Sequence, residues 1–187
     1  GEEFKSDWEY GSVIGKLNYL EKCTRPDLAF AVHQCARFSS NPRASHAIAV
    51  ERIGKYLSNN KDKGIIIRPD RRQEEFICWA DAAFAGEWNK DTAIDDPTTA
   101  KSRTGYVFNY AGCPLTWTSK LQTEIALSTG EAEDIALSQS LREVIYMMQL
   151  VDEIKKRKIP LLGKAQTLVR YKAFEDNMGA LELSKVP

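Results

Sequence analysis

Three carboxylates in this sequence stand where together they could bind divalent cations: Asp81, Glu133 and Asp176. Asp81 and Asp176 each follow an apolar, strand-like run, and Glu133 lies in the first turns of a long helical pattern. Carboxylate oxygens are the ligands that hard cations such as Mg²⁺ prefer. Two such ions can contact the attacking and the leaving oxygen of a phosphodiester. We therefore predict that these three residues are the metal ligands and catalytic residues of one site.

Helical spacing separates Glu133 from its neighbour Glu131. At about 100° per residue, later apolar residues lie within roughly 80° of Glu133; they are Leu137, Leu141, Val144, Met148 and Val151. Glu131 follows Ser128 at the spacing of a capping box. We expect Glu131 to cap the helix and Glu133 to face a sheet, where a buried carboxylate is costly without a compensating partner.

Each of these acids alone also has an ordinary structural explanation. A glutamate near the start of a helix commonly interacts with the helix dipole, and an aspartate at the end of a strand commonly begins a turn. The occurrence of three acids on two strand ends and one helix is what favours a metal site.

The elements that must position these acids lie in the second part of the chain. Four segments have strand-like composition: residues 76–82, 105–110, 114–118 and 167–174. Two segments have helical patterns: residues 131–158 and 177–185. Ala111-Gly112 supplies a hairpin turn, and residues 89–103 form a polar loop. This order of elements predicts an α/β or α+β domain with one mixed sheet.

The first part of the chain is expected to be a small helical subdomain. Helical patterns cover about residues 13–20, 27–38 and 44–57. Pro26 suits the first turn of the second helix. In the third helix we expect four residues to face inward: Ile48, Ile53, Tyr56 and Leu57. The charged segment 70–75 marks a boundary, which gives predicted domains 1–69 and 70–187.

The composition sets limits on the class of protein. The 187 residues include 26 basic and 26 acidic side chains, so any nucleic-acid contact requires a local basic patch. The four cysteines have no metal-binding spacing, which favours a reduced, intracellular setting. No apolar run is long enough to span a membrane. Because the chain begins at Gly1 and stops at Pro187, we expect a fragment of a longer protein.

Five short motifs occur in a fixed order in the second part of the chain. They are Trp79–Gly86, Ser102–Phe108, Pro114–Gln122, Ala126–Glu133 and Glu175–Asn177. In this order they resemble the ribonuclease H domain of Ty1/copia-type LTR retrotransposon polyproteins. Upstream, residues 12–20 and 24–32 resemble the end of the reverse transcriptase region, its thumb and connection.

The resemblance implies an RNase H-like fold with a mixed five-stranded-type sheet and packed helices. It implies hydrolysis of the RNA strand of RNA–DNA hybrids with two Mg²⁺ (or Mn²⁺) ions. One ion would activate a water, and the other would stabilise the leaving 3′ oxygen. Asp81, Glu133 and Asp176 match the family's first three metal-binding carboxylates. The implied partners are the hybrid and the polymerase domain of the same polyprotein, in a cytoplasmic virus-like particle or in the nucleus.

The resemblance also suggests how the hybrid is held. RNA–DNA hybrids are recognised mainly through groove shape and 2′-hydroxyl contacts. Lys101, Arg103 and Lys120 are candidates for contacts to backbone phosphates, although each is equally well explained as an ordinary solvated cation. The family's fourth carboxylate follows a later strand, so we expect this chain to lack the last strand and helix of the domain.

Two other functions are compatible with the sequence. The first is a degenerate or domesticated domain that binds nucleic acid or a protein partner without cleavage. The second is a purely structural domain that packs against a polymerase or another protein. Ala83 stands where the family often has a second aspartate, and Asp134 stands where an aromatic residue is usual. Such departures are compatible with a decayed or domesticated copy, although Ala83 does not stand at the position of an expected metal ligand.

Overall fold

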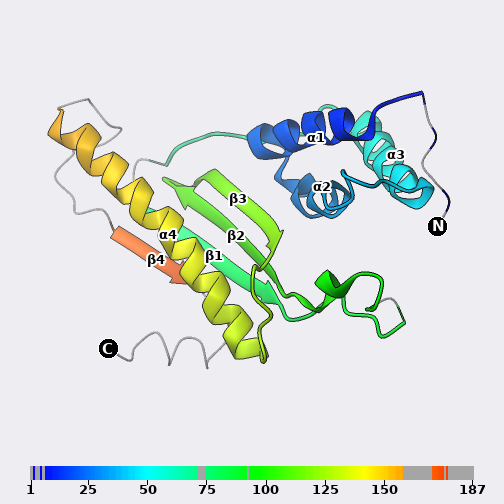
Figure 1. The fold of residues 1–187 in the computed structure, drawn as a ribbon. Helices are drawn as coiled ribbons and strands as arrows, with labels where there is room; N and C mark the ends of the chain where they lie inside the picture. Colours follow the sequence, from blue (N-terminus) through cyan, green and yellow to red (C-terminus); the bar gives the residue numbers. More distant parts are fainter. Residues whose placement is uncertain are drawn as a thin grey trace. The chain divides into compact units, whose positions relative to one another are not determined.

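The computed structural model describes residues 2, 5, 7–70, 75–91, 93–157, 170–174 and 176. The chain divides into two compact units, residues 1–66 and 67–187. The first unit is helical, and the second contains a sheet covered by one long helix (Figure 1). The division lies three residues before the boundary that the sequence suggests after residue 69.

The first unit consists of short helices around one apolar core. They are α1 (Tyr10–Thr24), η1 (Pro26–Leu28), α2 (Ala29–Ala36) and α3 (Ala44–Asn59). Pro26 begins a 3₁₀ turn, and the α-helix proper follows from Ala29. The buried core residues are Tyr10, Ile14, Leu17, Leu28, Val32, Cys35, Val50 and Ile53. Helices at the three predicted places are confirmed.

Two predicted inward positions of α3 are wrong. Ile48 is 52% exposed and Tyr56 is 41% exposed. The buried face of α3 is instead formed by Ala47, Val50 and Ile53. Apolar residues occur on more than one face of this helix, and the face with smaller side chains fits against its neighbours. The Tyr56 hydroxyl lies at the surface and donates to Asp27 at 2.8 Å.

The second unit is built on a four-stranded mixed sheet. Its strands are β1 (Glu75–Ala83), β2 (Arg103–Tyr110), β3 (Cys113–Leu121) and β4 (Arg170–Phe174), in the order β3-β2-β1-β4. The first three pair antiparallel, and β4 pairs parallel with β1. This arrangement confirms a mixed α/β fold. The beginning of the last predicted strand, residues 167–169, and the predicted helix 177–185 lie outside the described residues.

The hairpin between β2 and β3 follows the predicted turn. Ala111 and Gly112 both have left-handed backbones, with φ of 52° and 75°. Two successive positive φ values match the right-handed twist of the paired strands. The preceding loop contains a short 3₁₀ helix, η2 (Pro97–Ala100), which Asp96 caps by accepting from the Thr98 amide.

Helix α4 (Thr129–Lys156) covers one face of the sheet. Its contact with β1 and β2 forms the main core: Phe76, Cys78, Ala80, Tyr106, Phe108 and Val144. Phe76 and Phe108 stack with ring centroids 5.1 Å apart. Cys78 is 1% exposed in this core, and burial raises the pKa of its thiol. Buried residues alternate with less buried ones along β1, so every second side chain of this strand faces α4.

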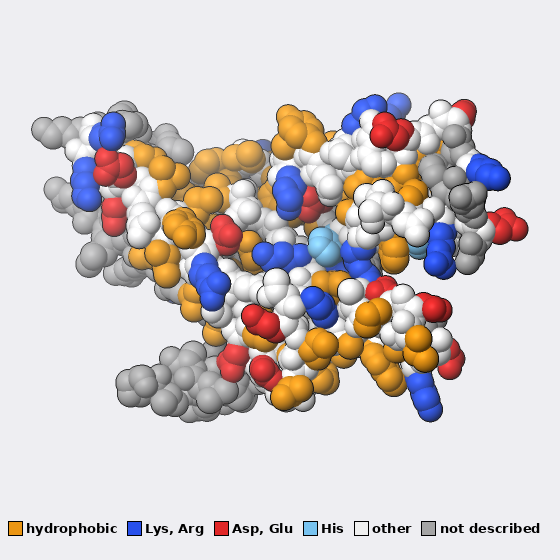
Figure 2. All heavy atoms as spheres, viewed as in Figure 1, with side chains coloured by type: hydrophobic (Ala, Val, Ile, Leu, Met, Phe, Trp, Pro, Cys, Tyr) orange, Lys and Arg blue, Asp and Glu red, His pale blue; other side chains and the backbone are white. Residues whose placement is uncertain are grey.

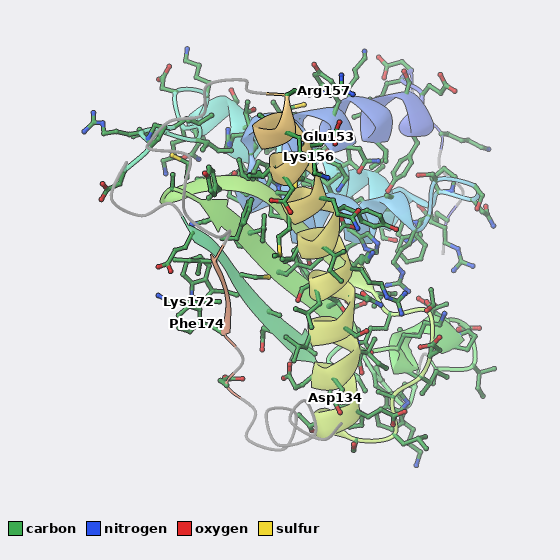
Figure 3. The ribbon with its side chains drawn as sticks, turned by 90° about the vertical axis from the view of Figure 1, so that its left-hand side faces the viewer. Asp134, Glu153, Lys156, Arg157, Lys172 and Phe174 are labelled. Carbon is green, nitrogen blue, oxygen red and sulfur yellow. The ribbon has the colours of Figure 1, made fainter. Side chains whose placement is uncertain are left out.

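Lys172 and Phe174 of β4 are exposed. Figure 3 shows Lys172 and Phe174 pointing away from α4. Lys172 forms an ion pair with Glu75 of β1 at 2.9 Å.

At the C-terminal end of α4, Glu153 forms an ion pair with Arg157 at 2.9 Å. The two residues are four positions apart, which is the favourable spacing for such a pair on a helix surface.

The surface of α4 mixes side chains of every kind. Figure 2 shows one face of this helix, on which hydrophobic, basic and acidic side chains are interspersed.

All four cysteines are free thiols. Among the described residues, no helix combines the length and the apolar character that crossing a bilayer requires.

Candidate metal centre

Asp81 lies on β1, two residues before the strand ends at Ala83. The neighbouring residues Ala80 and Ala82 are buried, whereas Asp81 is exposed. Its register partner on β2 is Gly105. Because glycine has no side chain, the residue opposite Asp81 does not cover the carboxylate.

Glu133 is brought close to β1 by an interface of small side chains. The buried cluster that joins the first turns of α4 to β1 consists of Ala82, Ala126, Ala132 and Ala136. Ala82 adjoins Asp81 in the sequence, and Ala132 adjoins Glu133. Alanine side chains are small, and protein interiors pack without voids. The backbones of the helix and the strand therefore lie close together at this interface. Glu133 is only 4% exposed.

Asp176 is positioned by the parallel pairing of β4 with β1. Trp79 of β1 lies opposite Phe174 of β4, and their rings stack with centroids 5.8 Å apart. Asp81 and Asp176 each follow one of these aromatic residues by two positions. The register therefore carries both aspartates to the same level of the sheet.

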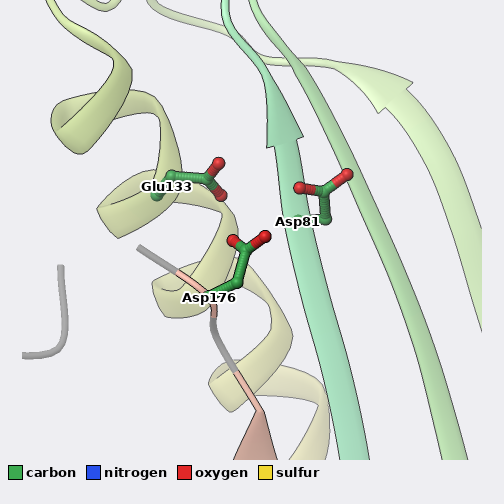
Figure 4. A group of neighbouring side chains, drawn as sticks. All are labelled: Asp81, Glu133 and Asp176. Atoms are coloured by element: carbon green, nitrogen blue, oxygen red, sulfur yellow. The ribbon is translucent and has the colours of Figure 1, made fainter. Parts of the chain in front are cut away.

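The three carboxylates meet in one cluster. Each offers an oxygen that lies within 4.8 Å of the others, and the side chains come from β1, α4 and the segment after β4 (Figure 4). At a Mg²⁺–oxygen distance of about 2.1 Å, two ligands on opposite sides of one ion are about 4.2 Å apart. Shifts of less than about 1 Å would let all three bind a common ion. The donor set therefore fits a hard divalent cation.

The neighbouring Glu131 has a capping role. Its amide donates to the Ser128 hydroxyl at 3.1 Å, and its side chain accepts from the Leu127 amide at 2.7 Å. In a capping box the Glu131 side chain accepts from the amide of the N-cap residue, Ser128. Here it accepts from the amide of Leu127, one residue earlier, and the arrangement is otherwise the capping box that the sequence indicates. Glu131 is exposed and Glu133 is buried, so the predicted orientation of the two glutamates is confirmed.

Removing the cap should weaken the first turn of α4. We expect Ser128→Ala to lower the free energy of unfolding by about 1 kcal/mol, because the Glu131 amide loses its acceptor. Urea unfolding of the full chain, followed by tryptophan fluorescence, measures this change. Ser138→Ala, at an exposed position in the same helix, is the control. Equal stabilities of the two variants would show that Ser128 is no cap.

Arg103, a predicted phosphate contact, is buried at the start of β2. It is 7% exposed. Its guanidinium donates to Glu87 at 2.7 and 3.1 Å and to the Ser119 carbonyl at 3.3 Å. In this arrangement Arg103 joins the loop after β1 to β2 and β3.

The two candidate lysines lie closer to the surface. Lys120 is exposed. Register pairs Ala82 with Thr104, and Thr104 with Lys120, so Lys120 lies two strands from β1, about 10 Å away. It is therefore at the same end of the sheet as the carboxylates. Lys101 donates through Nζ to the Thr123 carbonyl at 2.8 Å.

Three buried polar residues near the site are not among the site residues that the sequence predicts. Ser102, Thr104 and Gln122 are buried. The Ser102 hydroxyl accepts from the Ala85 amide at 3.2 Å, which holds the loop after β1. A usable signal was available: each is a polar residue within or beside a strand that is otherwise apolar on its inner face.

Comparison of the sequence with curated proteins shows the family of this chain. The chain is 35% identical over 178 residues to the retrovirus-related Pol polyprotein from transposon TNT 1-94 of Nicotiana tabacum, which is 94% of this chain. It is 29% identical over 154 residues to the Pol polyprotein from transposon RE1 of Arabidopsis thaliana, which is 82% of this chain. The chain belongs to the Ty1/copia-type retrotransposon Pol family. The resemblance noted in the sequence is confirmed.

This Ty1/copia-type chain spans 12% of the TNT 1-94 polyprotein and 10% of the RE1 polyprotein. It is also 34% identical over 138 residues to secreted RxLR effector protein 161 of Plasmopara viticola. That match covers 74% of this chain and 90% of the effector. No protein-family model matches the chain, and no solved structure matches it at a significant level.

Proposed function

We propose that the second unit is a retroelement ribonuclease H domain, which hydrolyses the RNA strand of RNA–DNA hybrids with two Mg²⁺ or Mn²⁺ ions. The observation that carries this proposal is the cluster of Asp81, Glu133 and Asp176, whose ligand oxygens lie within 4.8 Å of one another. Residues that lie far apart in the sequence form it from three different elements. Membership of a Pol family supports a substrate made of nucleic acid.

The sheet supports the same proposal. Three antiparallel strands are followed by a helix and then by a strand parallel to the first. A mixed sheet with a packed helix is what the resemblance to the ribonuclease H domain implies. We propose that the complete domain has the fifth strand that the resemblance implies.

The three carboxylates have distinct surroundings. Glu133 is buried in the helix–sheet interface, which restricts its rotamers and holds one oxygen in place. Asp81 and Asp176 are exposed, as contact with a polymeric substrate requires. When bound, divalent cations supply a more acidic water and stabilise charge on the leaving oxygen. The like charges of the three acids favour binding of such cations.

Lys120 is the best-placed contact for a substrate phosphate. We expect Lys120→Ala to lower hybrid affinity roughly fivefold, as loss of an exposed ion pair does, and to reduce the salt dependence by about one phosphate. Hybrid binding at several salt concentrations measures both quantities. Lys156→Ala, at the far end of α4 (Figure 3), is the matched control. Unchanged salt dependence in Lys120→Ala would remove this residue from the interface.

We propose that the first unit is a segment of the reverse transcriptase thumb and connection. Its short helices and the motifs at residues 12–20 and 24–32 support this assignment. The partner would then be the polymerase domain of the same polyprotein, and the site of action a cytoplasmic virus-like particle or the nucleus.

A hybrid with differently labelled strands tests the proposed activity. With Mg²⁺ or Mn²⁺, the full chain is expected to cut the RNA strand, to leave the DNA strand intact, and to leave 5′-phosphate ends. Double-stranded DNA of the same sequence is the control substrate, and a chelator should stop the reaction. Cutting of the DNA strand, or cutting that persists with chelator, would contradict the proposal.

A second candidate is a domain that binds nucleic acid or a protein without cleaving it. The observation that favours it is the similarity to secreted RxLR effector protein 161, of which the match covers 90%. The name of that relative describes an effector and does not mention a nuclease. Tight hybrid binding without any cleavage, under metal concentrations that stabilise the chain, would select this candidate.

A further inference from the structure

Gln122 lies directly after β3 and is almost completely buried. Its exposed fraction is 1%, although glutamine is usually a surface residue. Its backbone amide donates to the Ser102 carbonyl at 2.8 Å, which fixes the chain as it leaves the sheet. A buried amide side chain is retained at low cost only where hydrogen bonds replace those with water.

The side chain of Gln122 joins the sheet to the first turn of α4. Its Nε2 atom donates to the Thr104 hydroxyl at 3.2 Å and to the Ala132 carbonyl at 2.8 Å. A primary amide has two N–H donors, so each of these bonds uses one. Thr104 and Ala132 are themselves 0% exposed.

The two acceptors of Gln122 adjoin two of the metal carboxylates in sequence or register. Thr104 pairs with Ala82 of β1, the residue that follows Asp81. Ala132 is the residue before Glu133. The contacts of Gln122 therefore connect the backbone that carries Asp81 with the helical turn that carries Glu133.

We infer that Gln122 is a positioning residue, which fixes the separation between Asp81 and Glu133 and so prepares the cluster for a divalent cation. This inference rests on the proposed metal-dependent function. The alanine interface holds α4 against β1. Because apolar contacts are not directional, they do not fix the position of the helix along the strand. The hydrogen bonds of Gln122 are directional. They therefore fix the position of the first turn of α4 relative to β2.

Gln122→Met is the variant that tests this role. Methionine has a similar length and no charge, but it cannot donate to either acceptor. Gln149→Met, at an exposed position on α4, is the matched control. Amide hydrogen exchange along α4 and a titration with Mn²⁺ alone are measured on the full chain, for both variants and the unchanged protein.

We expect Gln122→Met to raise exchange of amides in the first two turns of α4 at least about tenfold, because the variant loses two hydrogen bonds. Exchange beyond Val144 should stay unchanged. The Mn²⁺ concentration for half-saturation should rise at least about tenfold, as for other residues that orient metal ligands. Gln149→Met should change neither quantity.

Unchanged exchange in the first turns, or a uniform increase along the whole helix, would overturn the inference, because Gln122 would then be an ordinary core residue. An unchanged Mn²⁺ titration in Gln122→Met would overturn it as well, provided that the unchanged protein binds Mn²⁺. If the unchanged protein binds no Mn²⁺, the proposed function fails. The exchange pattern then still decides whether Gln122 holds this turn.

Discussion

Replacing Asp81 by asparagine is expected to lower cleavage of an RNA–DNA hybrid by more than about 100-fold, beyond the usual effect of residues that only orient metal ligands. The substitution keeps the size of the side chain but removes the charge that a hard cation requires. Asp81 is exposed, and the packing of β1 on α4 rests on its neighbours Ala80 and Ala82. The variant should therefore fold as the unchanged chain does.

Initial cleavage rates at saturating metal, together with circular dichroism spectra, measure these two effects of Asp81→Asn. Asp91→Asn, at an exposed position in the loop after β1, is the matched control and should cleave at the unchanged rate. A folded Asp81→Asn variant with full activity would remove Asp81 from the site and with it the proposed chemistry.

Metal addition is expected to stabilise the second unit strongly, and Glu133→Gln should abolish that gain. At a hundredfold excess of metal over Kd, binding to the folded state contributes about 2.7 kcal/mol, which for a unit of this size is about 10 °C in Tm. Without metal, Glu133→Gln should melt higher than the unchanged chain. The substitution relieves repulsion among carboxylates whose oxygens lie within 4.8 Å.

Thermal unfolding followed by tryptophan fluorescence measures this effect, because Trp79, Trp88 and Trp117 lie in the second unit. Glu131→Gln is a close control, since Glu131 is two residues away and serves the helix cap. It should keep the full metal-dependent gain. If Mg²⁺ or Mn²⁺ stabilised Glu133→Gln as much as the unchanged chain, Glu133 could not be a ligand.

The local part of the site was readable from the sequence. The helical period placed Glu133 on the inner face of α4, and the spacing of Ser128 and Glu131 indicated the cap. Both rest on interactions within a few residues, which spacing along the chain determines. Strand-like runs and the turn at Ala111-Gly112 were found for the same reason.

The meeting of Asp81, Glu133 and Asp176 was predicted, but the hydrogen bonds and ion pairs between distant residues that support the site were not readable from the sequence. Gln122 bonds to residues 18 and 10 positions away, and Lys172 of β4 pairs with Glu75 at a distance of 97 positions. No local pattern encodes such pairings. The partner of Arg103, Glu87, likewise became apparent only in the folded chain.

The errors in α3 have a packing origin. Ile48 and Tyr56 are large side chains, yet Ala47 and Val50 occupy the core in their place. Hydrophobicity alone does not choose between two apolar faces of one helix. The choice depends on which face fits the neighbouring helices, and that is a property of the assembled unit.

The central claim is that Asp81, Glu133 and Asp176 together bind a divalent cation. Anomalous scattering from crystals of the full chain soaked in Mn²⁺ tests it most directly. A peak is predicted within about 2–2.5 Å of an oxygen from each of the three carboxylates, the range for hard cations, and it should be absent in Asp81→Asn. Mn²⁺ peaks elsewhere on the chain, with none at this cluster, would contradict the account.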